Sequence, residues 1–158
     1  MSIVDTKKLN FMNALKDGAI QSMHDSGIKA SITLAQAAVE SSWLTSQLAI
    51  QAKNVFGIKA TSSWTGKILA MPTKEYVNGH IVTVDANWRC YDSYAASLAD
   101  HANFFVVNPR YAKALAVKGD AAQFAAAIQA AGYSTNPGYA DLLMAIIRSN
   151  NFQQFDSL

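Results

Sequence analysis

The sequence predicts a mainly helical domain of the α+β class with one inserted β-hairpin. Apolar residues recur at helical spacing through most of the chain, and much of the 51% hydrophobic content is alanine, which favours close-packed helices. Between residues 66 and 91 the pattern changes to β-branched and aromatic residues on either side of a turn signal. At 158 residues, the chain fits one domain, residues 1–158, which is long enough to bury a core without disulfides.

The first helix is expected over residues 6–25. Apolar side chains recur there at helical spacing, and Asp5 or Thr6 can cap the N-terminus. Gly27 fits as the terminator, because glycine readily adopts the left-handed conformation that often ends a helix.

The second helix is expected to start at Ser31, a good N-cap, and to end at Glu40. Two apolar stripes run along it, which indicates burial on most sides. A short third helix is expected from Thr45, in the stretch TSQLAIQA, before the irregular stretch KNVFGIKA.

A β-hairpin is expected around Asn78-Gly79, because both central residues of a type I′ turn need positive φ. Pro72 would lie near the start of the first strand, where a missing N–H does least harm. The two-residue turn sets the register, which pairs Val77 with His80 and Glu75 with Val82.

Helical signals return from Ser93. A helix is expected over 94–107, a short helical piece after Asn108-Pro109, and another helix over 121–131. The helix over 121–131 has a capping box and a glycine stop, formed by Asp120, Gln123 and Gly132. The final helix is expected to start with Asn136 as cap and Pro137 in the first turn, and to run through Ile147.

Charge and cysteine content exclude several classes of function. The 13 basic and 11 acidic side chains are scattered, and no run of Lys or Arg is long enough to follow phosphates, so nucleic acid is not expected as a partner. Cys90 is the single cysteine, and the three histidines lie too far apart for a local zinc motif, so we expect no disulfide, metal or cofactor. No stretch approaches the roughly 18 apolar residues of a membrane span, so no membrane insertion is expected.

The N-terminal stretch MSIVDTKKLNFMNALKDG has charges spread through it and no long apolar segment. It therefore does not resemble a secretory signal, and we expect synthesis in the cytoplasm without a signal peptide.

Glu40 carries the one full charge in the apolar stretch ASITLAQAAVESSWL, residues 30–44. Partial desolvation at the end of such a helix would raise the pKa of its carboxyl group and make it an acid able to donate a proton near neutral pH. The residues leave a structural alternative open: exposure at the helix end, or a salt bridge to Lys53, Lys59 or Arg89.

Glu75 is a second carboxylate, placed on the expected hairpin. A helix-borne acid that faces a hairpin carboxylate across a cleft is an arrangement that glycosidases use. Aromatic rings near the loops could stack on sugar faces: Trp43, Trp64, Trp88, Tyr91, Tyr111, Tyr133 and Tyr139. The turn in AGYSTNPGY, residues 131–139, would present Tyr133 and Thr135 at a defined place.

Six stretches of the chain form a recognisable set: LAQAAVESSW (34–43), LAIQAKNVFGIKA (48–60), SWTG (63–66), TKEY (73–76), WRCYDSYAASLADH (88–101), and RYAKAL followed by AGYSTNPGYADLL (110–143). In order and spacing they resemble glycoside hydrolase family 73, which contains glucosaminidase domains of bacterial autolysins, flagellar rod-associated hydrolases and some phage lysins. Two positions depart from the family pattern: Ser42, where the family often has glycine, and Asn136, where it has aspartate.

The resemblance implies a lysozyme-like fold and an endo-β-N-acetylglucosaminidase that cuts peptidoglycan on the reducing side of N-acetylglucosamine. The family's catalytic acid falls on Glu40, its hairpin carboxylate on Glu75, and the tyrosine of its AGY motif on Tyr133. Substrate-binding residues are expected at Ser41, Trp43, Asn54, Phe56, Trp64, Thr135 and Tyr139.

Two other functions stay open from the sequence: a muramidase that cuts the neighbouring linkage, and a non-catalytic glycan-binding module. The presence of both carboxylates favours an enzyme, because a binding module has no need of a desolvated acid. We expect a monomer that binds peptidoglycan glycan strands. We expect a phage or prophage endolysin that reaches the cell wall after holin-type release. An effector exported by dedicated machinery and a domain of a larger autolysin are the alternatives.

Overall fold

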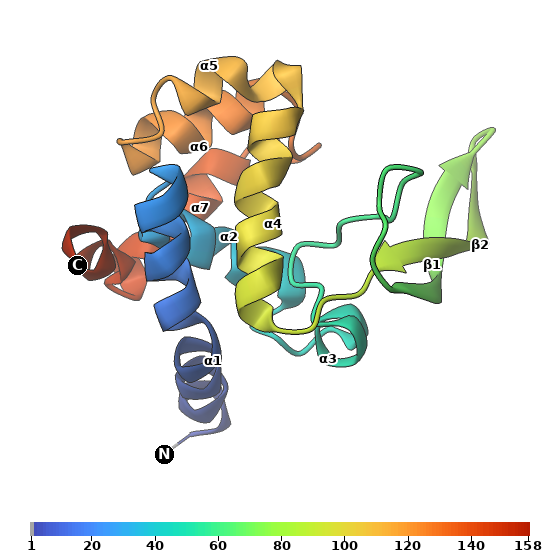
Figure 1. Cartoon of the computed structure of the whole chain (residues 1–158), viewed down its shortest axis with the longest axis horizontal. Coiled ribbons are helices and arrows are strands. Elements are labelled where there is room, and N and C mark those ends of the chain that lie inside the picture. The colour runs from blue at the N-terminus through green and yellow to red at the C-terminus, as the bar shows by residue number, and fades with distance from the viewer. Residues whose placement is uncertain (1) are drawn as a thin grey trace.

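The computed structural model of the chain describes residues 2–158. Helices form one body, and a two-stranded β-hairpin projects from it (Figure 1). Helix α4 (Tyr94–Val107) lies between the hairpin and most of the other helices (Figure 1). The predicted mainly helical fold with one inserted hairpin is therefore confirmed.

Helix α1 (Ile3–Ser26) begins three residues before the predicted start. Ser2, not Asp5 or Thr6, is the N-cap: its hydroxyl accepts a hydrogen bond from the Asp5 N–H at 3.2 Å, and the Asp5 carboxylate accepts from the Ser2 N–H at 3.4 Å. This reciprocal capping box satisfies two backbone donors at the helix start. Gly27 ends the helix as predicted, with φ of 81°.

Helix α2 (Ala30–Ser41) starts one residue before Ser31, so the prediction of Ser31 as N-cap is wrong. Its N-cap, Lys29, makes no side-chain cap bond. Asp156 in the C-terminal 3₁₀-helix η2 (Phe152–Ser157) supplies the missing acceptor: its carboxylate binds the Ser31 N–H at 2.8 Å and the Ser31 hydroxyl at 2.6 Å. An anion at a helix N-terminus also interacts favourably with the helix dipole.

Asp156→Ala is expected to lower the free energy of unfolding by about 1–2 kcal/mol, because it removes the acceptor that caps α2. Urea denaturation would measure the loss. Ser157→Ala is the matched control, since the exposed Ser157 hydroxyl makes one long bond, of 3.4 Å, to a neighbouring carbonyl. Equal stability of the two variants would show that Asp156 does not support α2.

The hairpin pairs β1 (Ile68–Val77) with β2 (His80–Arg89) in the predicted register, with Val77 opposite His80 and Glu75 opposite Val82. Asn78 and Gly79 have φ of 50° and 79°, as a type I′ turn requires. Pro72 is the fifth residue of β1, opposite Asp85, and so lies further inside the strand than predicted. Alternation from the turn places this pair at a non-hydrogen-bonded position, so proline removes no ladder bond there.

Helix α3 (Gln47–Ala52) and the region after the hairpin follow the predicted pattern closely. The Ser46 and Ser93 hydroxyls cap α3 and α4, and α4 has the predicted bounds. After Asn108 come the short elements η1 (Pro109–Tyr111) and α5 (Ala112–Leu115), where a short helical piece was expected.

Helix α6 (Ala121–Ala130) is capped by Asp120, which accepts from the Gln123 N–H at 2.9 Å, and Gly132 follows its end with φ of 86°. Helix α7 (Tyr139–Ser149) starts later than the predicted cap at Asn136. The Asn136 side chain accepts from the Gly138 N–H at 2.9 Å, which closes a local turn, so the helix begins only after it.

The core lies between α1, α2, α4, α6 and α7. Its fully buried large side chains include Phe11, Leu15, Ile32, Leu34, Leu98, Phe105, Phe124, Ile128 and Leu143. Across residues 2–158, no helix combines the length and apolar character that crossing a membrane requires.

Candidate functional site

A cleft of about 820 Å³ opens beside α4. Its wall combines the end of α2, the loop after α3, the base of β2, α4, η1 and the turn before α7. Its charged and aromatic lining residues are Glu40, Phe56, Lys59, Trp64, Arg89, Asp100, His101, Phe104, Arg110, Tyr111 and Tyr133. Segments far apart in the sequence thus meet at one concave surface of the size that small-ligand sites usually have.

Glu40 faces this cleft from the last turn of α2, and solvent reaches its carboxylate from the open side. The Tyr139 hydroxyl donates a hydrogen bond to its Oε1 at 2.9 Å. The surrounding protein desolvates the carboxyl group and raises its pKa above the ordinary value, while the bond from Tyr139 opposes that rise. Such a carboxyl group can act as a general acid.

The predicted alternative of a salt bridge at Glu40 is not what the structure contains. Lys59 pairs with Glu75 at 2.7 Å, and Arg89 pairs with Asp100 at 2.8 Å. Lys53 donates to the Asp92 carbonyl at 3.4 Å. Within residues 2–158, Glu40 therefore has no cationic partner.

A strained turn ends the helix directly after Glu40. Ser42, Trp43 and Leu44 all have positive φ, of 50°, 60° and 64°, which costs non-glycine residues free energy. The buried Ser41 hydroxyl holds the turn, because it accepts from the Leu44 N–H at 2.8 Å and donates to a carbonyl of α2 at 2.6 Å. Glycine would adopt the Ser42 conformation with less strain, which gives a physical reason for glycine at that position.

Tyr133 lines the cleft and belongs to a cluster of aromatic rings. Its ring stacks on Tyr139 with centroids 5.6 Å apart, and it lies 5.7 Å from Phe105 and 6.2 Å from Tyr111. Burial raises the pKa of the Tyr133 hydroxyl well above the ordinary value. Tyr133 therefore stays neutral at physiological pH and can offer a hydrogen bond to a bound group.

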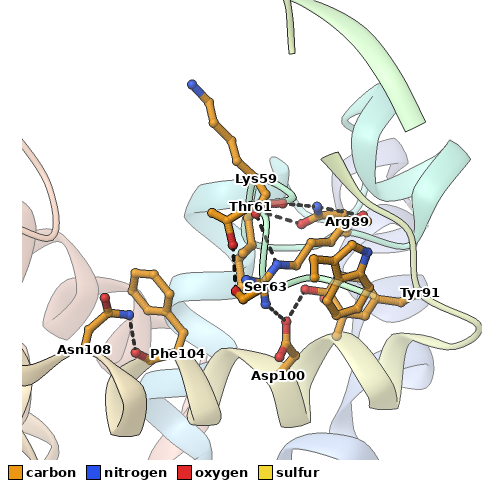
Figure 2. Close-up of polar contacts among 12 residues, drawn as sticks. Lys59, Thr61, Ser63, Arg89, Tyr91, Asp100, Phe104 and Asn108 are labelled. Carbon is orange, nitrogen blue, oxygen red and sulfur yellow. Dashed lines mark hydrogen bonds and ion pairs between the residues drawn. The ribbon is translucent and has the colours of Figure 1, made fainter. Parts of the chain in front are cut away.

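The opposite side of the cleft is held by an ion pair between β2 and α4, shown in Figure 2. Asp100 accepts from Arg89 at 2.8 Å and from the Tyr91 hydroxyl at 2.6 Å (Figure 2). The Arg89 guanidinium lies over the Trp64 ring, 4.8 Å from its centroid, and its Nε donates to the Lys59 carbonyl at 3.1 Å. These contacts tie the loop that carries Trp64 to α4, so Trp64 has a fixed position in the cleft wall.

His101 on α4 also lines the cleft but is almost completely buried, with 1% of its surface exposed. Its ring stacks on Phe56 with centroids 3.7 Å apart, and within residues 2–158 neither ring nitrogen has a hydrogen-bond partner. Burial lowers its pKa to about 3. His101 is therefore neutral, and its imidazole ring packs beneath the cleft.

Comparison with known proteins now identifies the family. The glucosaminidase family model, described as mannosyl-glycoprotein endo-beta-N-acetylglucosaminidase, matches residues 16–152. The chain belongs to the glucosaminidase family. The resemblance to glycoside hydrolase family 73 drawn from its motifs is thus confirmed.

Curated relatives and a solved structure agree with this glucosaminidase assignment. The peptidoglycan hydrolase FlgJ of Salmonella typhimurium is 40% identical over 143 residues, which cover 88% of this chain and 45% of FlgJ. The exo-glucosaminidase LytG of Bacillus subtilis is 36% identical over 132 residues, which cover 81% of this chain and 46% of LytG. The catalytic domain of the autolysin Auto from Listeria monocytogenes matches with a TM-score of 0.86 and 30% identity, and the match covers 96% of this chain and 88% of that domain. The chain spans less than half the length of these two curated relatives.

Glu75 lies beside the cleft but is not part of its lining. Its carboxylate binds the ammonium group of Lys59, which does line the cleft. The two expected catalytic carboxylates, Glu40 and Glu75, therefore do not both line the cleft.

Of the expected substrate-binding residues, Phe56 and Trp64 line the cleft, whereas the exposed Thr135 does not. Asn54 is buried and holds the loop: it donates to the Ile58 and Arg89 carbonyls, both at 2.9 Å, and accepts from the Ile58 N–H at 3.0 Å. Its side chain therefore shapes the cleft wall.

Ser41, Trp43 and Tyr139 do not line the cleft either. The Trp43 ring packs against Phe11 with centroids 4.9 Å apart and faces α1, so it anchors the strained turn. Ser41 and Tyr139 are buried and support Glu40 from inside the protein.

Sequence reasoning missed Gln36 and the pair of Arg89 and Asp100. Gln36 is fully buried one turn before Glu40, and the spacing of four residues on a helix was the signal that could have identified it. Arg89 and Asp100 come from different elements, and no local pattern indicates their pairing. Within residues 2–158 there is also no group of three or more His, Cys, Asp or Glu side chains placed to hold a metal.

Proposed function

We propose that this glucosaminidase hydrolyses the β-1,4 glycosidic bond of peptidoglycan on the reducing side of N-acetylglucosamine, with Glu40 as the general acid. The observation that carries the proposal is the position of Glu40: its carboxyl group faces a cleft of about 820 Å³, is partly desolvated and has no cationic partner within residues 2–158. The relatives named peptidoglycan hydrolase and exo-glucosaminidase support the choice of substrate.

In this proposal the protonated Glu40 donates its proton to the leaving oxygen, and its pKa, raised by desolvation, keeps that proton available. Tyr133 positions the N-acetyl group of the sugar or the attacking water. Glu75 acts as base or stabilises positive charge. Because Glu75 is bound to Lys59 beside the cleft, that role requires the hairpin to move toward the sugar. Assistance by the N-acetyl group itself is the alternative.

Mass spectrometry of digested cell walls tests the proposed bond. Fragments with N-acetylglucosamine at the new reducing end are the expected products. N-acetylmuramic acid at that end would assign a muramidase instead. Binding to walls without release of any fragment would assign a glycan-binding module.

We also propose that the chain acts as a monomeric lysin, as expected of a phage or prophage endolysin. Rapid loss of turbidity of permeabilised bacterial cells, at low enzyme concentration, is the expected result. Hydrolysis of purified walls without lysis of cells would contradict the lysin role and fit a remodelling autolysin. Sedimentation or light scattering gives the oligomeric state.

Trp64→Ala is expected to raise KM on glycan fragments about tenfold, because loss of one stacked aromatic contact removes about 1–1.5 kcal/mol of binding. Trp43→Phe is the matched comparison. The Trp43 ring lies outside the cleft, so that variant should keep its KM and lose thermal stability. An unchanged KM for Trp64→Ala would remove Trp64 from the substrate site.

A further inference from the structure

Two buried side chains behind Glu40 form a hydrogen-bonded chain with it. Gln36 lies four residues before Glu40 on α2, so both side chains project from the same face of the helix. The Gln36 Nε2 donates to the Tyr139 hydroxyl at 3.2 Å, and that hydroxyl donates to Glu40 Oε1 at 2.9 Å. Gln36 is fully buried and Tyr139 is 2% exposed, so water does not compete at either group.

This arrangement suits an ionised Glu40. A tyrosine hydroxyl has a single proton to donate. Because the Gln36 amide group donates to the Tyr139 oxygen, the Tyr139 proton is free to bind the Glu40 carboxylate, which can only accept. A hydrogen bond to a charged acceptor is stronger than one between neutral groups.

A Glu40 that is protonated on Oε1, the oxygen bound to Tyr139, needs the opposite arrangement. The Tyr139 oxygen then accepts the Glu40 proton, and the Tyr139 proton needs a new partner. Gln36 Oε1 is buried and, within residues 2–158, has no hydrogen-bond partner. Rotation of the amide group about its last torsion exchanges Nε2 for Oε1, and Oε1 can then accept the Tyr139 proton.

We infer that Gln36 and Tyr139 form a reversible hydrogen-bond relay that holds the Glu40 side chain in one position in both its ionised and its protonated form. The inference rests on the proposed role of Glu40 as general acid, since an acid that loses and regains a proton in each cycle needs support in both states. Tyr139 and Gln36 are then positioning residues that do not touch the substrate.

The other groups around Glu40 do not replace the relay. Helix α6 carries no titratable side chain, and Asp156 of η2 is bound to Ser31 at the opposite end of α2. The exposed Asp141 and Arg148 of α7 make no side-chain bond to Glu40. The remaining titratable groups at the cleft are Lys59, Arg89, Asp100, His101, Arg110, Tyr111 and Tyr133. Of these, Arg89 and Asp100 neutralise each other, and Lys59 binds Glu75.

Glu40 and Glu75 are the two glutamates of the chain, so NMR of protein labelled with ¹³C-glutamate follows the Glu40 carboxyl group directly. Glu75→Gln assigns the two signals. Tyr139→Phe is expected to raise the midpoint of the Glu40 titration by about one pH unit, because it removes the donor to the ionised form. Gln36→Met is expected to lower the midpoint, because the ionised form keeps its bond from Tyr139 whereas the protonated form loses the acceptor for the Tyr139 proton.

The opposite signs of the two shifts are specific to a relay. Shifts of the same sign, or no shift in either variant, would overturn the inference. Tyr94→Phe is the control, because the Tyr94 hydroxyl binds the Ala49 carbonyl at 3.4 Å and does not reach Glu40. Circular dichroism verifies that each variant is folded.

The pH dependence of kcat/KM separates this inference from the proposed function. If Glu40 is the acid, the pH above which kcat/KM falls should shift together with the NMR midpoint. This pH should rise in Tyr139→Phe and fall in Gln36→Met. If the midpoints shift with opposite signs and this pH does not follow them, the relay stands and the catalytic role of Glu40 fails.

Discussion

Replacement of Glu40 by glutamine is expected to lower kcat/KM on peptidoglycan by about a hundredfold or more, since an amide cannot donate a proton to the leaving oxygen. Glutamine has nearly the same shape, and its amide oxygen can still accept the hydrogen bond from Tyr139. The fold should therefore survive. Release of new reducing ends from purified cell walls gives the rate, and thermal unfolding verifies the structure.

Asp17→Asn is the matched control for this experiment. Asp17 is exposed on α1 and makes no side-chain hydrogen bond or ion pair in the part of the chain that the structure describes, so its loss of charge should leave the rate unchanged. Persistence of a near wild-type rate in Glu40→Gln would mean that the acid lies elsewhere. Glu75→Gln, measured in parallel, tells whether the hairpin carboxylate takes part.

The second large expected effect is a decrease in the free energy of unfolding at acidic pH, caused by His101. Burial lowers its pKa in the folded protein to about 3, against an ordinary value of 6.5. Below pH 6.5 the unfolded chain binds a proton at this residue that the folded chain does not. The stabilising contribution is therefore complete above pH 6.5 and is lost as the pH falls toward 3, at about 1.4 kcal/mol per pH unit and about 4–5 kcal/mol in total.

His101→Phe should remove this part of the pH dependence, because phenylalanine does not titrate and can still stack on Phe56. Urea unfolding of both proteins between pH 4 and pH 7 measures the difference in slope. His80→Gln, at the exposed hairpin turn, is the control and should keep the wild-type slope. If the free energy of unfolding depended on pH equally in the wild type and in His101→Phe, groups other than His101 would cause the loss of stability in acid.

Local signals explain which parts of the fold could be predicted. The hairpin and α4 follow from residues close together in sequence: Asn78-Gly79 determines the turn and register, and Ser93 caps α4. The start of α2 could not be predicted this way. Its cap, Asp156, is 125 residues away from Ser31, and only the folded chain brings the two together.

The candidate site also has features that the sequence predicted and features that only the structure shows. The apolar surroundings of Glu40 correctly indicated a desolvated carboxyl group, although its catalytic role stays a prediction. Trp43 follows Glu40 closely in sequence, but three successive left-handed residues turn its ring toward α1 and away from the cleft. Helical periodicity identifies which residues are buried but not which neighbours they meet, so the bond between Tyr139 and Glu40 needed the structure.

The bond between Asp156 and Ser31 also has a consequence for synthesis on the ribosome. Helix α2 is made early, yet the acceptor for its first turn is translated 125 residues after Ser31. Until residue 156 has left the ribosome, the nascent chain has the helix that carries Glu40 without its cap and without η2 packed against it. Contacts that span most of the sequence form late and slow folding. The cleft can therefore become fully ordered only after residue 156 has emerged, and hydrolytic activity should appear only after translation has passed that point.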